Sequence, residues 1–419
     1  MKILYLTAGA AQMYCGSCLR DNALAAELRR QGHDVLLLPM YTPTRTDEPN
    51  ASYEKVFFGG VSVYLEQYAP FLPRWLDRLW DAGPVLRWAA RRKIQTAPKV
   101  LGEMTVSMLQ GADGRQRREI AKLTEWLEHE PPPDVISLPY TLLIALAEPL
   151  KQALKRPVVC TLQGEDLFLE GLPEPYRTQS LDLIRSQVRH VDAFIAVSEY
   201  YAEFMQKYLH IPPEKMRTVP LGINLDGYTM RETSAKPFTV GYFARVAPEK
   251  GLHLLAEAFQ IVRRSVPDAR LEVAGYLGAE HESYLREVAR CDGFNYRGEL
   301  DKDGKVNFLR GLDVLSVPAT YDEPKGIFLL EAMACGVPVA QPRRGAFTEV
   351  VEKTGGGLLV EKDLPESLAA GLLEIYRNPT RAAELGRNGF AAVREHYSVG
   401  LMAERTVDVF KALAEMTDN

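Results

Sequence analysis

The sequence of 419 residues contains no long hydrophobic run. Its longest apolar stretch, residues 135–147, is interrupted by Pro139 and is shorter than the ~20 residues that a membrane-spanning helix needs. The opening residues, MKILYLT, have no extended apolar region and no small-residue cleavage site, so they predict a first strand and not a signal peptide. These absences argue against a secreted or membrane-spanning protein.

Cysteine and excess positive charge are also scarce. Five cysteines, with Cys160 and Cys335 in expected core elements, predict a reducing cytoplasm and not a disulfide framework. The motif Cys15-Gly-Ser-Cys18 has no second cysteine pair and no nearby histidine, so it does not predict a zinc site. A net charge of −5 argues against general nucleic-acid binding.

Two further motifs are missing or weak. No G-x-G-x-x-G follows any expected strand, which disfavours a nicotinamide-dependent oxidoreductase. Asp301-Lys-Asp303 forms a D-x-D string, but it lies in a polar turn and does not predict metal binding. We therefore predict no metal site and no cofactor.

The sequence does contain a regular alternation of apolar runs and amphipathic helices. With 46% hydrophobic and 25% charged residues, the chain is long enough for two sizeable domains. Strands separated by helices predict parallel sheets, and hence two Rossmann-like α/β domains. The expected strands are residues 2–7, 35–40, 135–138, 158–162, 194–197, 238–243, 271–274, 294–296, 314–317, 337–341 and 358–360.

Turn-forming and charged residues place the domain boundary in a linker at residues 222–237. The first domain is then residues 1–221, with an inserted region at about 41–130, and the second is residues 238–396. Within the insertion, residues 57–64 alternate around two glycines and predict a hairpin or short extra strands. Residues 75–93 mix tryptophan with arginine and lysine, which fits either an interfacial membrane helix or packing within the domain.

The segment PATYDEPKGIFLLEAMACGVP, at residues 318–338, carries the clearest functional signal. A helix is expected at residues 326–335, with Glu323 before it and Glu331 about two turns inside it. The N–H groups of Gly326, Ile327 and Phe328 would be free to bind a phosphate or sugar oxygen, while the two carboxylates accept hydrogen bonds from hydroxyls. This arrangement suits a diphosphate sugar nucleotide, although a core helix with Glu331 facing water has the same spacing.

The same segment resembles the signature of glycosyltransferase family 4, which comprises retaining, sugar-nucleotide-dependent enzymes of the GT-B fold. Other parts of the chain resemble the family's motifs in the expected order, namely RQGHDV at residues 30–35, AVS at 196–198, VPLGIN at 219–224, GYFARVAPEKG at 241–251 and GAFTE at 345–349. Together these motifs cover most of the chain, which makes the resemblance specific.

The resemblance implies two Rossmann-like domains with parallel sheets facing across an interdomain cleft, and a last helix, residues 397–419, that crosses back to the first domain. It also implies transfer of a hexose from a UDP, GDP or ADP sugar to an acceptor hydroxyl, forming an α-linkage without a metal. The acceptor would be a carbohydrate, a lipid-linked compound or a small molecule, reached in the cytoplasm or at the membrane surface.

A nucleotide-sugar-binding homologue without transferase activity is the main alternative to this function. A glycogen-synthase-like polymerase is disfavoured because Lys-x-Gly-Gly-Leu is absent near the start.

Cations and acids in the second half are the candidate donor site. Arg245 and Lys250 follow the expected strand at 238–243, where they can neutralise a departing diphosphate. The resemblance assigns both residues to the donor diphosphate. It further assigns Glu331 to the ribose, Glu323 to the donor hexose and the backbone around Arg297 to the base.

Lys325 is a departure from the family, which has an aromatic residue at this position. It can orient Glu323, contact the diphosphate or recognise an anionic group on donor or acceptor, and a solvent-facing lysine is the fourth reading.

The first half departs from the family at two places. The first is Cys15-Gly16, where the family usually has a Gly-Gly turn close to the diphosphate and the acceptor. Gly16 still permits a ligand to approach the backbone closely. Cys15 and Cys18 are either redox-active or small packing residues.

Gln163 occupies the position of a histidine that contacts the donor hexose. Its amide forms hydrogen bonds but cannot act as an acid or base. Next to it, Glu165 and Asp166 are acceptor-side candidates or helix caps.

Overall fold

The computed structural model describes residues 1–9, 16–42, 46, 48–53, 98–231 and 237–417. The chain divides into two compact units. Unit 1 comprises Met1–Val197, Tyr201–Val219 and Ala403–Asn419, and unit 2 comprises Ser198–Tyr200 and Pro220–Met402. The predicted linker therefore falls, where described, within unit 2. The sequence features at Cys15, 57–64 and 75–93 lie outside the described residues.

Unit 1 contains a parallel sheet of six strands in the order β2-β1-β3-β4-β5-β6. Three of the four interior strands, β3, β4 and β5, are buried along their whole length, because their sequences are mostly apolar on both faces. The strands are β1 (Lys2–Thr7), β2 (Asp34–Pro39), β3 (Val135–Leu138), β4 (Val158–Leu162), β5 (Ala193–Ala196) and β6 (Met216–Thr218).

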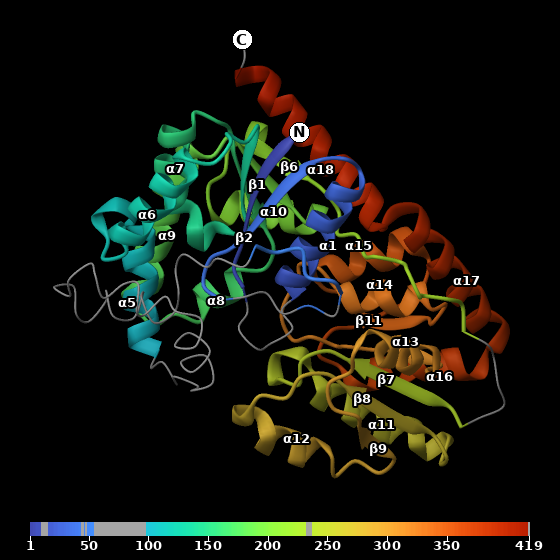
Figure 1. The fold of residues 1–419 in the computed structure, drawn as a ribbon. Helices are drawn as coiled ribbons and strands as arrows, with labels where there is room; N and C mark the ends of the chain where they lie inside the picture. The colour runs from blue at the N-terminus through green and yellow to red at the C-terminus, as the bar shows by residue number, and fades with distance from the viewer. Residues whose placement is uncertain (10–15, 43–45, 47, 54–97, 232–236, 418–419) are drawn as a thin grey trace. The chain divides into compact units, whose positions relative to one another are not determined.

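Unit 2 contains a second parallel sheet of six strands, in the order β12-β11-β10-β7-β8-β9 (Figure 1). These strands are β7 (Thr239–Phe243), β8 (Arg270–Ala274), β9 (Phe294–Tyr296), β10 (Val314–Leu315), β11 (Val339–Pro342) and β12 (Gly357–Val360). The prediction of two Rossmann-like domains with parallel sheets is confirmed.

Helices connect the strands in both units. In unit 2, α11 and α16 pack against each other, whereas α14 and α15 both pack against α17 (Figure 1). Of the helices described, none is both long and apolar enough to cross a membrane.

The main helices of unit 1 are α1 (Gly16–Arg30), α5 (Pro98–Leu109), α6 (Arg117–Glu128), α7 (Ala147–Leu154), α8 (Asp166–Glu170), α9 (Tyr176–Gln187) and α10 (Glu199–Tyr208). Helix α10 begins in unit 2. The main helices of unit 2 are α11 (Leu252–Ser265), α12 (Glu282–Val288), α13 (Lys302–Arg310), α14 (Ile327–Ala334), α15 (Gly345–Thr354), α16 (Pro365–Arg377) and α17 (Pro379–His396). The last helix, α18 (Val399–Thr417), begins in unit 2 and continues in unit 1 from Ala403.

Three local predictions need correction. Strand β6 was not expected, because its short and partly exposed sequence has no apolar run. Strand β10 ends at Leu315 and not at residue 317. Helix α14 begins at Ile327, because Gly326 has a φ of +67° and lies outside the helix.

Candidate active site

The candidate donor residues lie where the strand order of unit 2 reverses. From β7 the chain runs outward through β8 and β9, and then returns to form β10 on the other side of β7. In open α/β sheets, ligands bind outside the carboxyl ends of the strands at such a reversal. Arg245 and Lys250 follow β7, and residues 319–326 follow β10, so both candidate loops leave the sheet at this point.

A tight turn at Gly251 brings these two loops together. Gly251 has a φ of +74°, and a Cβ there would lie 1.9 Å from the carbonyl oxygen of Pro318, so only glycine fits. In addition, the N–H of Thr320 donates to the carbonyl of Glu249 over 2.9 Å. The backbone therefore holds Lys250, just before the glycine, against the loop that carries Glu323.

Lys250, Glu323 and Tyr321 form a compact polar cluster. The Nζ of Lys250 lies 2.5 Å from Glu323 Oε2 and 2.5 Å from the Tyr321 hydroxyl, which also donates to Glu323. The Lys250 amine also lies 5.0 Å from the ring centroid of Tyr321 and 5.7 Å from that of Phe328, within cation–π range. The side chains of Lys250 and Glu323 are only 15% and 6% exposed, so the pair is largely shielded from water.

The cluster keeps Glu323 ionised. Burial on its own raises the pKa of Glu323, but Lys250, Tyr321 and Lys325 outweigh burial and the pKa is lowered. Burial and the Glu323 charge raise the pKa of Tyr321 well above its ordinary value, so the phenol stays neutral. At neutral pH, Glu323 can therefore only accept hydrogen bonds, which suits a ligand hydroxyl.

The start of α14 adds hydrogen-bond donors to this cluster. Gly326 adopts a left-handed conformation before the helix, with the ring of Phe347 3.3 Å from where a Cβ would lie. No acceptor is found among the described residues for the N–H groups of Gly326, Ile327 and Phe328. These groups stand at the positive end of the helix, close in sequence to Glu323, as predicted for a phosphate or sugar oxygen site.

Arg245 lies on the same loop but is more exposed. Its guanidinium is 2.5 Å from Glu249, and its side chain is 44% exposed. The positive charge of Arg245 lowers the pKa of Tyr321 and so offsets part of the rise caused by burial. Arg245 therefore interacts electrostatically with the cluster. Arg245 and Lys250 thus lie on one loop, with Arg245 on the solvent side.

Glu331 is buried, which rules out the reading in which it faces water. It accepts hydrogen bonds from Lys305 over 2.7 Å and from the Tyr228 hydroxyl over 3.1 Å. The side chains of Glu331 and Lys305 are both 9% exposed. Sequence reasoning missed Lys305 and Tyr228, because neither belongs to a motif and both are distant from Glu331 in the chain.

Arg297 and Lys325 are the remaining candidates for donor binding. The N–H of Arg297 is used by the sheet, donating to Val273 over 2.8 Å, while its side chain pairs with Glu272 at the surface. Lys325 is half-buried and helps to lower the pKa of Glu323. Its partial burial argues against a merely solvent-facing lysine, and the other three readings of Lys325 stay open.

The D-x-D string has a structural role. Asp301 caps α13 by accepting a hydrogen bond from the N–H of Gly304 over 2.8 Å. Within the described ranges, no three metal-binding side chains gather in one place. Metal independence remains a prediction.

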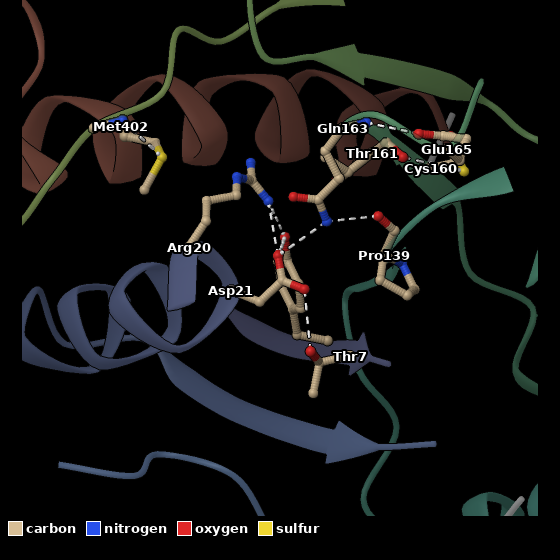
Figure 2. A network of polar contacts seen from close by, with 11 residues as sticks. Thr7, Arg20, Asp21, Pro139, Cys160, Thr161, Gln163, Glu165 and Met402 are labelled. Atoms are coloured by element: carbon tan, nitrogen blue, oxygen red, sulfur yellow. Dashed lines mark hydrogen bonds and ion pairs between the residues drawn. The ribbon is translucent and has the colours of Figure 1, made fainter. Parts of the chain in front are cut away.

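In unit 1, Gln163 and Glu165 belong to a buried network (Figure 2). The amide nitrogen of Gln163 donates to the carbonyl of Pro139 over 2.8 Å. Glu165 accepts hydrogen bonds from the N–H and hydroxyl of Thr141 and from the N–H of Gln163. Burial raises the pKa of Glu165 even though these donors lower it. Glu165 therefore links the segment that begins at Thr141 to the backbone of Gln163. Its side chain does not cap α8.

The remaining acceptor-side candidates give a mixed result. Asp166 accepts a hydrogen bond from the hydroxyl of Tyr201 over 2.6 Å. Cys18 is 1% exposed, which favours the packing reading over a reactive thiol. Gly16 begins α1, and a Cβ there would meet no atom of the described residues within 4 Å.

Comparisons with known proteins agree with this architecture. One family model, described as "Glycosyl transferase 4-like domain", matches residues 21–222, and another, "Glycosyl transferases group 1", matches residues 230–391. The structure also resembles sucrose-phosphate synthase from Thermosynechococcus elongatus, with a TM-score of 0.73 at 17% identity over 99% of this chain and 100% of that one. At that identity the likeness concerns the fold.

Curated relatives match shorter parts of the chain. The GDP-mannose-dependent monoacylated alpha-(1-6)-phosphatidylinositol monomannoside mannosyltransferase of Corynebacterium glutamicum is 28% identical over 290 residues, which cover 64% of this chain and 74% of that protein. The phosphatidyl-myo-inositol mannosyltransferase of Mycobacterium tuberculosis is 32% identical over 197 residues, which cover 45% of this chain and 50% of that protein. The chain thus spans about three quarters of one relative and half of the other.

Proposed function

We propose that this chain, a hexosyltransferase, uses a nucleoside diphosphate sugar as donor. The chain belongs to the group 1 glycosyltransferases of family 4, which have the GT-B fold. The hexose is transferred to an acceptor hydroxyl with retention of configuration, which forms an α-glycosidic bond. The main support for this proposal is the cluster of Lys250, Glu323 and Tyr321, close in sequence to the N–H groups of residues 326–328, which have no acceptor among the described residues.

The candidate donor-site residues have separate roles in the proposed reaction. Lys250 and Arg245 neutralise the diphosphate as the glycosidic bond breaks, which is where negative charge develops. Glu323 accepts hydrogen bonds from the hexose hydroxyls, since its lowered pKa keeps it ionised. Glu331, already held by Lys305, accepts from the ribose, and the backbone near Arg297 lies beside the base.

Proton transfer in this proposal needs no side-chain base. The resemblance to retaining family members implies that the departing phosphate helps to deprotonate the acceptor on the same face of the sugar. Gln163 then contributes a hydrogen bond and not a proton, because an amide does not titrate at neutral pH. The replacement of the family's histidine is therefore compatible with activity.

The two curated relatives suggest which substrates to try first. Both are mannosyltransferases whose names specify phosphatidylinositol acceptors, and one name specifies GDP-mannose. We place GDP-mannose first among donors and a lipid-linked acceptor first among acceptors, ahead of other carbohydrates and small molecules. The proposed location is the cytoplasm, with peripheral contact at the inner membrane face where a lipid acceptor is used.

A donor screen tests the proposal. The purified chain is mixed with UDP, GDP and ADP sugars, and binding is followed by thermal shift and hydrolysis by release of nucleotide. We expect one donor to raise the melting temperature and to be hydrolysed slowly, at a rate that EDTA leaves unchanged. Binding without hydrolysis or transfer would instead support a nucleotide-sugar-binding protein. Loss of activity in EDTA with recovery in Mg²⁺ or Mn²⁺ would contradict the cation mechanism.

A further inference from the structure

A second polar cluster lies inside unit 1, at the carboxyl ends of two strands (Figure 2). Tyr5 and Thr7 belong to β1, Arg20 and Asp21 to α1, and Gln163 directly follows β4. Each of these five side chains is 3% exposed or less. Polar atoms buried this deeply are normally paired, so any atom without a partner needs an explanation.

Most atoms of the cluster are paired with one another. The carboxylate of Asp21 accepts from Thr7 Oγ1 over 3.1 Å, from Arg20 Nη1 over 3.1 Å and from Gln163 Nε2 over 3.5 Å. Arg20 Nη1 also donates to the Tyr5 hydroxyl over 2.6 Å. The network thus uses one of the three guanidinium nitrogens of Arg20.

The orientation of the Gln163 amide is fixed by its surroundings. Its nitrogen faces the Pro139 carbonyl, 2.8 Å away, and the Asp21 carboxylate, and both of these groups accept hydrogen bonds. The amide oxygen must therefore point away from them. In the part of the chain that the structure describes, this buried oxygen has no hydrogen-bond partner.

Arg20 leaves a complete edge of its guanidinium without a partner. Nε and Nη2 are buried, and neither donates to any described atom. These two nitrogens form the side edge of the planar group, which presents two parallel N–H donors.

The buried Arg344 of unit 2 provides a contrast. Its guanidinium donates to the Ala319 carbonyl and to Asp363, and its Nε lies 3.7 Å from Asp322. Each nitrogen of Arg344 thus has an oxygen within hydrogen-bond or ion-pair distance, whereas Nε and Nη2 of Arg20 have no hydrogen-bond partner among the described residues.

We propose that the Nε–Nη2 edge of Arg20 binds a phosphate group of a substrate, while the Gln163 amide oxygen accepts a hydrogen bond from a hydroxyl of the same molecule. Two parallel N–H donors match two phosphate oxygens, and the unpaired oxygen of Gln163 requires a donor. The proposal rests on the proposed function, because the phosphate belongs either to the donor diphosphate or to the acceptor. Since Nε and Nη2 are covered in this conformation, binding requires a local opening.

The test compares variants of Arg20 in the full chain. Arg20→Lys keeps the charge and loses the two-pronged edge. The double variant Arg20→Met with Asp21→Asn removes both charges, so that no uncompensated acid stays buried. Arg30→Met is the matched control, because Arg30 lies on the same helix, is 73% exposed and pairs with Glu27. Circular dichroism and thermal unfolding select the variants that fold.

Two probes separate the sources of the phosphate. Binding of glycerol 3-phosphate, with glycerol as the phosphate-free reference, reports on an acceptor phosphate, and binding of GDP and UDP reports on the donor. Both are measured by calorimetry in the wild type, the Arg20 variants, Arg30→Met and Lys250→Met. We expect at least a 10-fold loss of affinity for one probe in both Arg20 variants and no change in Arg30→Met.

The probe that is lost identifies the source of the phosphate. Loss of glycerol 3-phosphate binding, retained in Lys250→Met, assigns an acceptor phosphate, whereas loss of nucleotide binding assigns the donor. Folded Arg20 variants that bind both probes as well as the wild type would overturn the proposal, as would a wild type that binds neither. A wild type that hydrolyses no nucleotide sugar, yet binds phosphate through Arg20, would remove the proposed function and leave this site intact.

Discussion

Units 1 and 2 each contain a buried acid paired with a cation and a tyrosine, but the two clusters are paired differently. Around Glu323, the Lys250 amine and the Tyr321 hydroxyl both bind the carboxylate, and Lys325 adds a second positive charge. Around Asp21, Arg20 contributes one nitrogen and keeps two without a partner among the described residues. Among the described residues, no buried side-chain atom of Lys250, Tyr321 or Glu323 lacks a hydrogen-bond partner, whereas Arg20 Nε and Nη2 both do.

The pKa values of the two acids respond accordingly. Burial raises the pKa of both carboxyl groups. At Glu323 the neighbouring cations and the tyrosine outweigh burial and the pKa falls, whereas at Asp21 the contributions of Arg20, Thr7 and Gln163 do not, and the pKa rises. The comparison shows that a salt bridge by itself does not fix the direction of a pKa shift. Glu323 has two lysines that lower its pKa, whereas Asp21 has one arginine.

The largest expected effect comes from removing a cation of the unit 2 loop. Lys250→Ala and Arg245→Ala should each lower turnover by about 10² or more while the fold remains, because each contact strengthens as the diphosphate leaves. Steady-state kinetics measure this effect. Arg343→Ala is the control, since Arg343 is more than half exposed and forms its ion pair with Glu352. Near-normal kinetics in both site variants would remove these residues from the site.

A separate pair of variants divides the roles of the two acids. Glu331→Gln should weaken binding of the nucleoside diphosphate by about 10-fold, because a charge-assisted hydrogen bond to ribose is lost. Glu323→Gln should leave that binding unchanged and impair transfer. Calorimetry with the nucleotide product, combined with turnover, distinguishes the two. Equal weakening of nucleotide binding by both variants would show that this division is wrong.

Lys325 sharpens the comparison, because it supplies the second positive charge near Glu323. Lys325→Met should raise KM for a substrate with an anionic group by about 10-fold and have little effect on a neutral analogue. The measurement is KM for the charged and neutral members of one substrate pair. Equal losses for both members would assign Lys325 to the diphosphate or to Glu323.

The smallest effect is on stability, and its sign differs between the clusters. The pKa of Glu323 lies below its ordinary value of 4.5, so its stabilising contribution is complete above pH 4.5 and is lost as the pH falls through the lowered pKa. The pKa of Asp21 lies above its ordinary value of 3.8, so its contribution is complete below pH 3.8 and is lost as the pH rises through the raised pKa.

Urea unfolding between pH 3 and pH 7 checks both signs. Relative to Glu323→Gln, the wild type should gain stability as the pH rises. Relative to Asp21→Asn, the wild type should lose stability over the same range. The same pH trend for both variants would contradict the opposite pKa shifts.

Much of the fold could be predicted from the sequence, because its strands are apolar runs separated by amphipathic helices. Ten expected strands match observed ones to within one or two residues, and β10 is shorter than expected by the same margin. Strand β6 escaped prediction because an edge strand needs no apolar run; its hydrogen bonds to β5 are sufficient.

Residues of the candidate site could be predicted from the sequence only where they belong to a recognisable motif. Lys250, Glu323 and Gly326 lie in short, recognisable segments, so their positions followed from the sequence. Tyr228 and Lys305 lie outside any motif, 103 and 26 residues from Glu331, so their contacts depend on packing. Tyr321 lies within the predicted segment, but the sequence did not indicate that its hydroxyl binds Glu323. The incomplete pairing of Arg20 was equally invisible, because it depends on the geometry of one buried side chain.

Calorimetric titration of nucleoside diphosphates into the wild type and Lys250→Met tests whether the cluster binds the donor. We expect that one of UDP, GDP or ADP binds the wild type and binds Lys250→Met at least 10-fold more weakly, while Arg343→Met binds like the wild type. If no nucleoside diphosphate binds the folded wild type, or if Lys250→Met binds it equally well, the cluster of Lys250, Glu323 and Tyr321 is not the donor site.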